Sequence, residues 1–399
     1  MTAQEKQVVL LTSLSQFINI LDFMIVMPMG PDFALSLDIP LEHIGILAGA
    51  YAIAAALAAI LLGHRLDSFE RRQVIWICLV GLGIATLLTS LSTGFYSLIS
   101  ARALAGAFGG IASSISMSMI FDFVRPHFRG RAMAWTMGAL SGASVIGVPL
   151  GLELSNRLGW QTPFVMIGIL TLGVAILSFY QLPKGKPHLA QADYKPVSNV
   201  LTLLSQRPIL LATLAISTMH FSMFCTIPHL ATYFQFNREV PRDIYSWFYM
   251  AGGIFGFVAM QLSGRMMDKL SAFPTLVGIC ITALLVFYLG FIIELWIAWL
   301  TFMLMMGMAF MRNVATQTYI GFVPKPSQRA AFNALTSAWV HGATGLASAV
   351  SAAILVTDAD HAFTNFSDIV WIALALAAFS LLCLTLLKIT HGEYMTPKS

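Results

Sequence analysis

Long, uninterrupted apolar runs constrain this chain more than any other feature of its sequence. Twelve of them follow one another, and each approaches the ~20 residues that an α-helix needs to cross a hydrocarbon core about 30 Å thick. The runs do not alternate between polar and apolar residues, which disfavours a transmembrane β-barrel. We therefore predict twelve transmembrane helices, over residues 7–30, 42–63, 73–91, 95–121, 132–155, 161–182, 208–234, 243–264, 273–294, 296–322, 330–356 and 367–388.

The composition agrees with an all-α membrane protein. Hydrophobic residues make up 58% of the chain and charged residues 10%, whereas a soluble domain is about 25% charged. The start of the chain leads directly into a full-length apolar run without a cleavage site, so we expect no cleavable signal peptide. The four cysteines all fall inside predicted spans and are expected to be buried apolar residues.

Lysine and arginine set the predicted orientation. When the connections are assigned alternately to two sides, 17 of the 22 basic residues lie on the side that holds both termini. The positive-inside rule places that side in the cytoplasm. Topology thus accounts for the net charge of +4, and no nucleic-acid partner is expected.

The chain is predicted to consist of two similar halves. A polar segment rich in Pro, Lys and Gln, residues 183–207, separates a bundle over 1–182 from a bundle over 208–399. GHRLDSFERR follows the second span and GRMMDKLSAF the eighth, about 200 residues later. FVRPHFRGRA and FVPKPSQRAA follow the fourth and tenth spans at the same offset. Two matches at one offset indicate a duplicated six-helix unit.

Four short motifs occur in the same order as in a known family. The loop GHRLDSFERR follows G-x-x-x-D-[RK]-x-G-[RK]-[RK] but departs from it at Ser68 and Glu70. The fourth span has an arginine followed four residues later by glycine, and the first span has L-D-x₈-P. The matching residues are Gly63, Asp67, Arg71 and Arg72 in the loop, Arg102 and Gly106 in the fourth span, Gly147, Pro149 and Gly151 in SGASVIGVPLG of the fifth, and Leu21, Asp22 and Pro31 in the first.

These motifs make the chain resemble the major facilitator superfamily over essentially its whole length. The likeness is strongest to the twelve-span drug:proton antiporter branch, which includes arabinose-efflux-permease-like proteins. The resemblance implies two pseudo-symmetric six-helix bundles that rock about a central cavity. For the fifth span it implies packing that limits leakage through the closed outer side, although close helix packing alone also explains the small residues.

The loop after the second span is a candidate conformational latch. Asp67 can cap a helix and pair with Arg71, and Asp122 is a second partner for the loop arginines. Such a cluster would hold the cytoplasmic ends of the halves together and release them on rocking. The alternative is a solvated turn that only fixes topology. The full set of latch candidates is Gly63, Asp67, Arg71, Arg72, Asp122 and the repeat positions Gly264 and Asp268.

Two opposite charges inside spans are the main functional candidates. Asp22 and Arg102 each lie about eight residues from the outer end of their span, so both are ~12 Å deep at 1.5 Å per residue. The resemblance places both helices beside the central cavity. A charge in a membrane is costly and marks a pathway or proton relay by default. We expect Asp22 to carry protons with Arg102 as its partner; a permanent structural ion pair is the alternative.

Several polar residues are candidate cavity contacts. His220 and His341 are predicted to share a depth near the midplane and can titrate between pH 5 and 8, although a buried histidine is more often only hydrogen-bonded. Arg312 either faces the cavity, which would suit an anionic or zwitterionic substrate, or snorkels to the cytoplasm. The candidate set is Gln16, Asn19, Phe23, His220, Arg312, Gln317 and His341.

These features predict a secondary active transporter. We expect proton-coupled export of a small organic molecule, such as a drug or metabolite, by a monomer in the bilayer of a bacterial inner membrane, with both termini cytoplasmic. Uptake symport of a nutrient and, less favoured, a non-transporting sensor are the alternatives. The sequence has no enzyme motif such as H-E-x-x-H or G-x-S-x-G and no metal-ligand spacing, so neither an enzyme nor a cofactor is expected.

Overall fold

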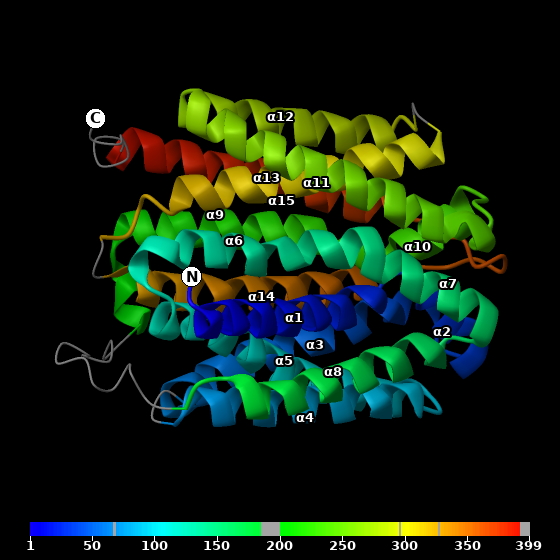
Figure 1. Ribbon diagram of the computed structural model, residues 1–399. Coiled ribbons are helices and arrows are strands. Elements are labelled where there is room, and N and C mark those ends of the chain that lie inside the picture. The colour runs from blue at the N-terminus through cyan, green and yellow to red at the C-terminus, as the bar shows by residue number, and fades with distance from the viewer. Residues whose placement is uncertain (67–68, 185–199, 295–296, 326–327, 392–399) are drawn as a thin grey trace. The chain divides into compact units, whose positions relative to one another are not determined.

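The computed structural model is built from helices over the residues it describes, which are 1–66, 69–184, 200–294, 297–325 and 328–391 (Figure 1). Each of the twelve predicted spans coincides with a helix or with a run of consecutive helices. Ten of these, among the described residues, are long and apolar enough to cross a membrane. The helices at the eighth and eleventh spans are as long but less apolar.

Contacts between residues group the chain into two compact units. The first comprises Met1–Lys195 together with Arg242–Met250. Within it α3 packs along α5, and α4 packs against both α5 and α8; Figure 1 shows α4 beside α8. Its helices are α1 (Ala3–Ile25), α2 (Gly30–Leu37), α3 (Ile44–Leu66), α4 (Arg71–Ser90), α5 (Phe95–Phe123), α6 (Pro126–Gly142), α7 (Val148–Leu158) and α8 (Gln161–Gln181).

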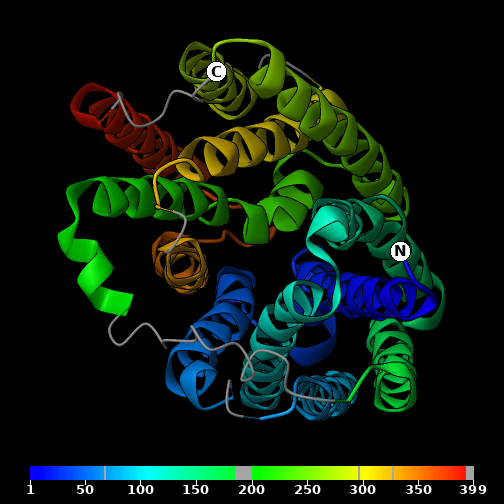
Figure 2. The ribbon, with the colours of Figure 1, turned by 60° about the vertical axis from the view of Figure 1, so that its left-hand side comes forward.

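The second unit comprises Pro196–Pro241 and Ala251–Ser399. Here α9 packs against α14 and α15, and α12 packs against α13 and α15; Figure 2 shows α14 beside α9. Its helices are α9 (Arg207–Phe224), α10 (Leu230–Thr232), α11 (Tyr245–Lys269), α12 (Ala272–Phe291), α13 (Ala298–Ile320), α14 (Arg329–Ile354) and α15 (Phe366–His391). The grouping assigns the first turns of α11 to the first unit, a division that the linker composition did not suggest.

The helix of the first span stops before its prolines. α1 ends at Ile25, and α2 begins at Gly30 with Pro31 in its first turn. A proline is tolerated there because the first N–H groups of a helix have no partner within the helix. Asp38 ends α2 in the left-handed conformation, with φ at 54°.

The fifth span contains one wide turn. A π-helical turn at Ala143–Gly147 joins α6 to α7, and the Val148 N–H donates to the carbonyl of Ala143, five residues back. Pro149 follows directly and has no N–H to donate. In a regular helix its ring would press on the carbonyl four residues earlier. The wide turn lies where that crowding would arise, and such turns are one of the recognised causes of helix bending.

Glycines in α5 let α3 approach it closely. A Cβ at Gly106 would lie 2.1 Å from the main-chain oxygen of Tyr51, and a Cβ at Gly109 would lie 2.2 Å from the Tyr51 hydroxyl. The first obstacle is backbone, which cannot turn aside. The helix pair therefore depends on the absence of a side chain at Gly106, as in other membrane helix contacts made through small residues.

Candidate functional site

A buried ion pair joins the first and fourth spans. Arg102 Nη1 donates to Asp22 Oδ1 and Nη2 to Oδ2, both at 3.0 Å, and Nη2 also donates to the Asp22 main-chain oxygen at 3.0 Å. Asp22 is 0% exposed and Arg102 1% exposed. This two-pronged geometry is the strong form of a carboxylate–guanidinium contact. The two charges predicted to share a depth are therefore brought together.

Residues of α4 and α3 also contact this pair. The Thr86 hydroxyl of α4 donates to Asp22 Oδ1 at 3.0 Å. The Tyr51 ring of α3 lies under the Arg102 guanidinium, 4.9 Å from ring centroid to Cζ, a cation–π contact. The sequence interpretation missed both residues, because a threonine or tyrosine inside a span is too common to signal a contact.

Polar contacts continue along α1 toward its N-terminus. The Tyr51 hydroxyl donates to Asn19 Oδ1 at 2.6 Å, so this predicted cavity residue is engaged by α3. The Phe23 ring packs on Tyr51 with centroids 5.1 Å apart. Gln16 Oε1 is buried without a hydrogen-bond partner, which marks it as the member of the candidate set with an unused acceptor.

The loop after the second span makes ion pairs through its described residues. Arg71 Nε donates to Asp122 Oδ2 at 3.1 Å, with both side chains largely buried. Arg72 Nε lies 3.7 Å from Glu70 Oε1. The glutamate that departs from the family motif thus faces a cation of the same loop. Asp67, the expected helix cap, lies outside the described residues, and the side-chain surroundings of Gly63 do too.

The corresponding positions of the second unit lie in the last turns of α11. Gly264 has open space where a Cβ would be added, and Asp268 is exposed. Among the described residues no ion pair involves Asp268. The first loop therefore has a cluster of charged side chains, whereas no such cluster is described at the repeat positions.

Two other ion pairs flank the first unit and were not foreseen. Arg125 Nε donates to Glu5 Oε1 at 2.8 Å where α5 meets α6. At the opposite end Arg242 donates to both carboxylate oxygens of Asp32, which also has a hydrogen bond from Ser155. Burial raises the pKa of the Asp32 carboxyl, and the Arg242 charge opposes that rise.

The glycines of the fifth-span motif face α1. A Cβ at Gly147 would lie 2.8 Å from Leu21 Cδ1, and one at Gly151 would lie 2.7 Å from Ile25 Cδ1. Both neighbours are ends of flexible side chains on the helix that carries Asp22. The motif therefore packs within the first unit, against the helix of the candidate proton carrier.

The candidate residues of the second unit fall into two groups. The Nδ1–H of His220 donates to the Ile216 carbonyl at 2.9 Å, and the electrostatic neighbours of this imidazole include Arg312 and His341. Gln317, in contrast, lies at an exposed part of α13 and donates to Asn313 at 2.6 Å. The structure thus brings His220, Arg312 and His341 together.

Arg312 lies buried in the second unit. The residue is 6% exposed and lines a small cavity with residues of α9, α12 and α15. Nη2 donates to the Met219 carbonyl at 3.5 Å, the limit for a hydrogen bond, and Nε is buried without a partner. Sequence position gives depth along a helix but not the direction in which a side chain points.

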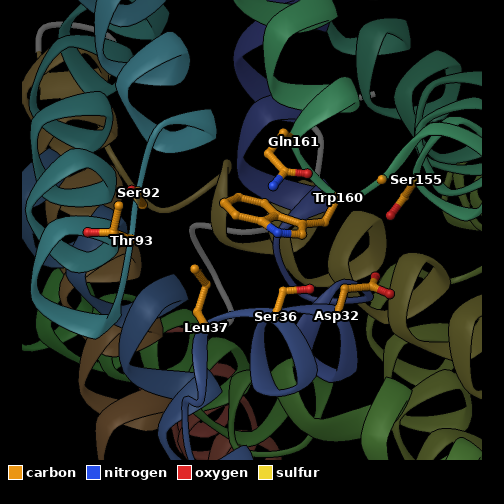
Figure 3. A pocket seen from close by; sticks show the side chains of 9 residues that line it. Asp32, Ser36, Leu37, Ser92, Thr93, Ser155, Trp160 and Gln161 are labelled. Atoms are coloured by element: carbon orange, nitrogen blue, oxygen red, sulfur yellow. The ribbon is translucent and has the colours of Figure 1, made fainter.

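A further cavity lies at the end of the first unit that the charge distribution assigns to the outside. It measures ≈ 520 Å³ and is open (Figure 3). Figure 3 shows the indole of Trp160 across its middle, with Ser36 and Asp32 on one side and Gln161 on the other. None of its lining residues belongs to the Asp22–Arg102 pair. Among the described residues, no cluster of His, Cys, Asp or Glu could hold a metal ion.

Comparison with known proteins decides the family. The model of the Major Facilitator Superfamily matches residues 12–348. The chain belongs to this superfamily. It is a membrane transporter rather than an enzyme, and the resemblance seen in its loop and helix motifs is confirmed.

Two relatives of this superfamily member carry names of efflux proteins. A "Probable sugar efflux transporter" of Helicobacter pylori (strain HPAG1) is 26% identical over 274 residues, 67% of this chain and 68% of that protein. The "Purine ribonucleoside efflux pump NepI" of Escherichia coli O6:K15:H31 is 26% identical over 246 residues, which span 61% of this chain and 59% of the pump.

Solved structures of other superfamily members share the fold. A bacterial homologue of the human lysosomal transporter Spinster, in an inward-facing and unoccupied conformation, has a TM-score of 0.76 at 14% identity over 100% of both chains. A D-xylose–proton symporter has a TM-score of 0.73 at 15% identity over 96% of this chain and 97% of its own. At such identities the likeness supports the major facilitator fold alone.

Proposed function

We propose that this protein exports a small polar metabolite of the sugar or nucleoside type in exchange for protons, with Asp22 as the proton carrier and with alternating access of the two bundles. The observation that carries the proposal is the buried Asp22–Arg102 pair inside two membrane spans. The relatives named as sugar and purine ribonucleoside efflux proteins support the direction and the cargo class.

The contacts of Asp22 suggest how a proton would be gained and lost. In the arrangement described here three side-chain hydrogen bonds hold the carboxylate charge, two from Arg102 and one from Thr86. Proton binding then requires Arg102 to withdraw, and proton release accompanies its return. This arrangement is the proton-free stage of the proposed cycle.

Arg102 has an alternative contact to keep while it is withdrawn. Its guanidinium lies over the ring of Tyr51, and its Nε has no hydrogen-bond partner. A cation–π contact offers the guanidinium some compensation once Asp22 is neutral. The Tyr51–Asn19 hydrogen bond fixes that ring. The side chains of Asp22, Arg102, Thr86, Tyr51 and Asn19 thus form a two-position device, in which one cation is shared between a carboxylate and a ring.

Vesicle assays test the proposal and its direction. Purified protein is reconstituted with a pH-sensitive dye and a panel of pentoses, hexoses and nucleosides inside, and the vesicles are diluted into cargo-free buffer. Antiport moves protons inward as cargo leaves, so the lumen acidifies; symport makes it alkaline. This sign does not depend on the orientation of the protein in the vesicle. No pH change with any cargo of the panel would refute the proposal.

A pair of variants isolates the role of Asp22. Asp22→Asn is expected to abolish cargo-driven proton movement while cargo-for-cargo exchange, which needs no net proton transfer, continues. Asp38→Asn is the matched control, since Asp38 is an exposed carboxylate in a left-handed turn that asparagine also accepts. Proton movement that persists in Asp22→Asn would assign the carrier to another residue.

A further inference from the structure

The second unit contains a buried cation that no described carboxylate neutralises. Arg312 is only 6% exposed. Among the described residues, its guanidinium makes one hydrogen bond, which is 3.5 Å long and is accepted by the Met219 carbonyl. Its Nε is buried without a partner. Its electrostatic neighbours are His220 and Cys280. Arginine does not lose its proton in proteins, so this charge needs compensation from elsewhere.

The guanidinium lines a small, partly enclosed space. A cavity of ≈ 10 Å³ lies among α9, α12, α13 and α15, with Arg312 and Ser222 as its polar lining and apolar side chains of α12 and α15 around the rest. A cavity of that volume is about large enough to hold one water-sized particle. The Ser222 hydroxyl already donates to the Ala373 carbonyl at 2.7 Å. Hence Arg312 supplies the free donors of this cavity, and an acceptor suits it.

Charge and size together select the occupant. An isolated charge in the apolar interior of a membrane protein is strongly unfavourable unless it is paired. A cargo molecule with a carboxylate is too large for a space of this volume. We propose that the cavity binds one small monovalent inorganic anion of about the size of chloride, which neutralises Arg312 and stabilises the packing of α9, α12, α13 and α15. This site is separate from the Asp22–Arg102 pair and does not depend on the direction of transport.

Thermal unfolding in matched salts tests the site. The purified transporter is unfolded in sodium gluconate and in sodium chloride of equal ionic strength, with intrinsic tryptophan fluorescence as the readout. A ligand that binds only the folded state raises the midpoint with the logarithm of its concentration above the dissociation constant. We expect a rise on the order of 3 °C at about ten times that constant. Equal midpoints in both salts would overturn the proposal.

Variants assign the effect to Arg312. Arg312→Gln is expected to remove the chloride dependence without lowering the midpoint in gluconate, since it removes the charge that needs compensation. Arg265→Gln, the same change at an exposed arginine of α11, is expected to keep the dependence. A chloride response that appears only in Cys280→Ala would identify the thiolate as the counter-ion of the unmodified protein and would overturn the proposal.

Bromide locates the ion even where Arg312→Gln fails to fold. Crystals of the unmodified protein grown in bromide are expected to show an anomalous-scattering peak beside the Arg312 guanidinium. A peak at this position supports the site. An ordered cavity with no anomalous signal would mean that water fills it, and the proposed anion site would then be wrong.

Discussion

Removing one partner of the Asp22–Arg102 pair should be far more harmful than removing both. Asp22→Asn deletes the charge that accepts two hydrogen bonds from Arg102 and leaves that guanidinium, 1% exposed, with its bond to the main-chain oxygen of residue 22. Breaking a buried pair in this way costs about 3–5 kcal/mol. Arg102→Met leaves the carboxylate with Thr86 alone and should cost a similar amount.

The double variant Asp22→Asn/Arg102→Met contains neither charge. Since exchanging a whole buried pair for neutral groups is often close to neutral, its loss should be smaller than either single loss. It should therefore be smaller than the sum of the two single losses by at least about 3–5 kcal/mol, at or above the upper end of measured coupling energies. Denaturant or thermal unfolding of the four proteins in one detergent measures this cycle. Losses that simply add would refute the reasoning, because they would mean that the two side chains do not compensate each other.

Two further predictions concern substitutions of residues in the first unit. Gly106→Ala should lower the stability by about 1–3 kcal/mol, the usual penalty for overpacking, because its Cβ would lie 2.1 Å from the Tyr51 carbonyl oxygen. Gly138→Ala is the control, since no atom lies within 4 Å of its Cβ, and it should not lower the stability. Equal melting midpoints of the two variants would contradict this prediction. Burial raises the pKa of Asp32, so the folded protein binds that proton more readily than the unfolded chain does. Through this group, stability therefore rises as the pH falls from above the raised pKa toward the ordinary value of 3.8. The difference in melting midpoint between the unmodified protein and Asp32→Asn should follow that slope, and a flat difference from pH 7 to pH 4 would contradict it.

Hydropathy was sufficient to predict the helices, because each span must satisfy its backbone hydrogen bonds internally and present apolar side chains to lipid. Depth was predictable for the same reason: counting residues from a span end placed Asp22 and Arg102 at one level. The direction of a side chain around its helix was not predictable. That direction depends on which neighbouring helix it packs against, and a single sequence contains no such information.

Arg312 and Thr86 illustrate this limit from two sides. Arg312 was expected either to face the cavity or to reach the cytoplasmic surface, and its depth alone gave no sign of the helices among which its 6% exposed side chain is buried. Thr86 carried no signal at all. Its single hydroxyl hydrogen is within bonding distance of the Leu82 carbonyl, a contact that many helical threonines make, and also of Asp22 Oδ1. Two residues of opposite charge can be paired from the sequence by their depth in the membrane. Neutral residues that contact a charge can be identified only from the three-dimensional structure.

The wide turn at Ala143–Gly147 bears on how this chain should be aligned with its relatives. A π-helical turn holds one residue more than the α-helical turn it replaces, so such a turn can accommodate one inserted residue without shifting the residues on either side. A relative that lacks this turn should therefore be one residue shorter between α6 and α7. A single-position gap there would reflect a real difference in helix shape. An ungapped alignment would instead match every later residue of α7 to a residue about 100° away around the helix, since a turn holds 3.6 residues. Gly151, which faces Ile25 here, would then be matched to a residue that faces elsewhere.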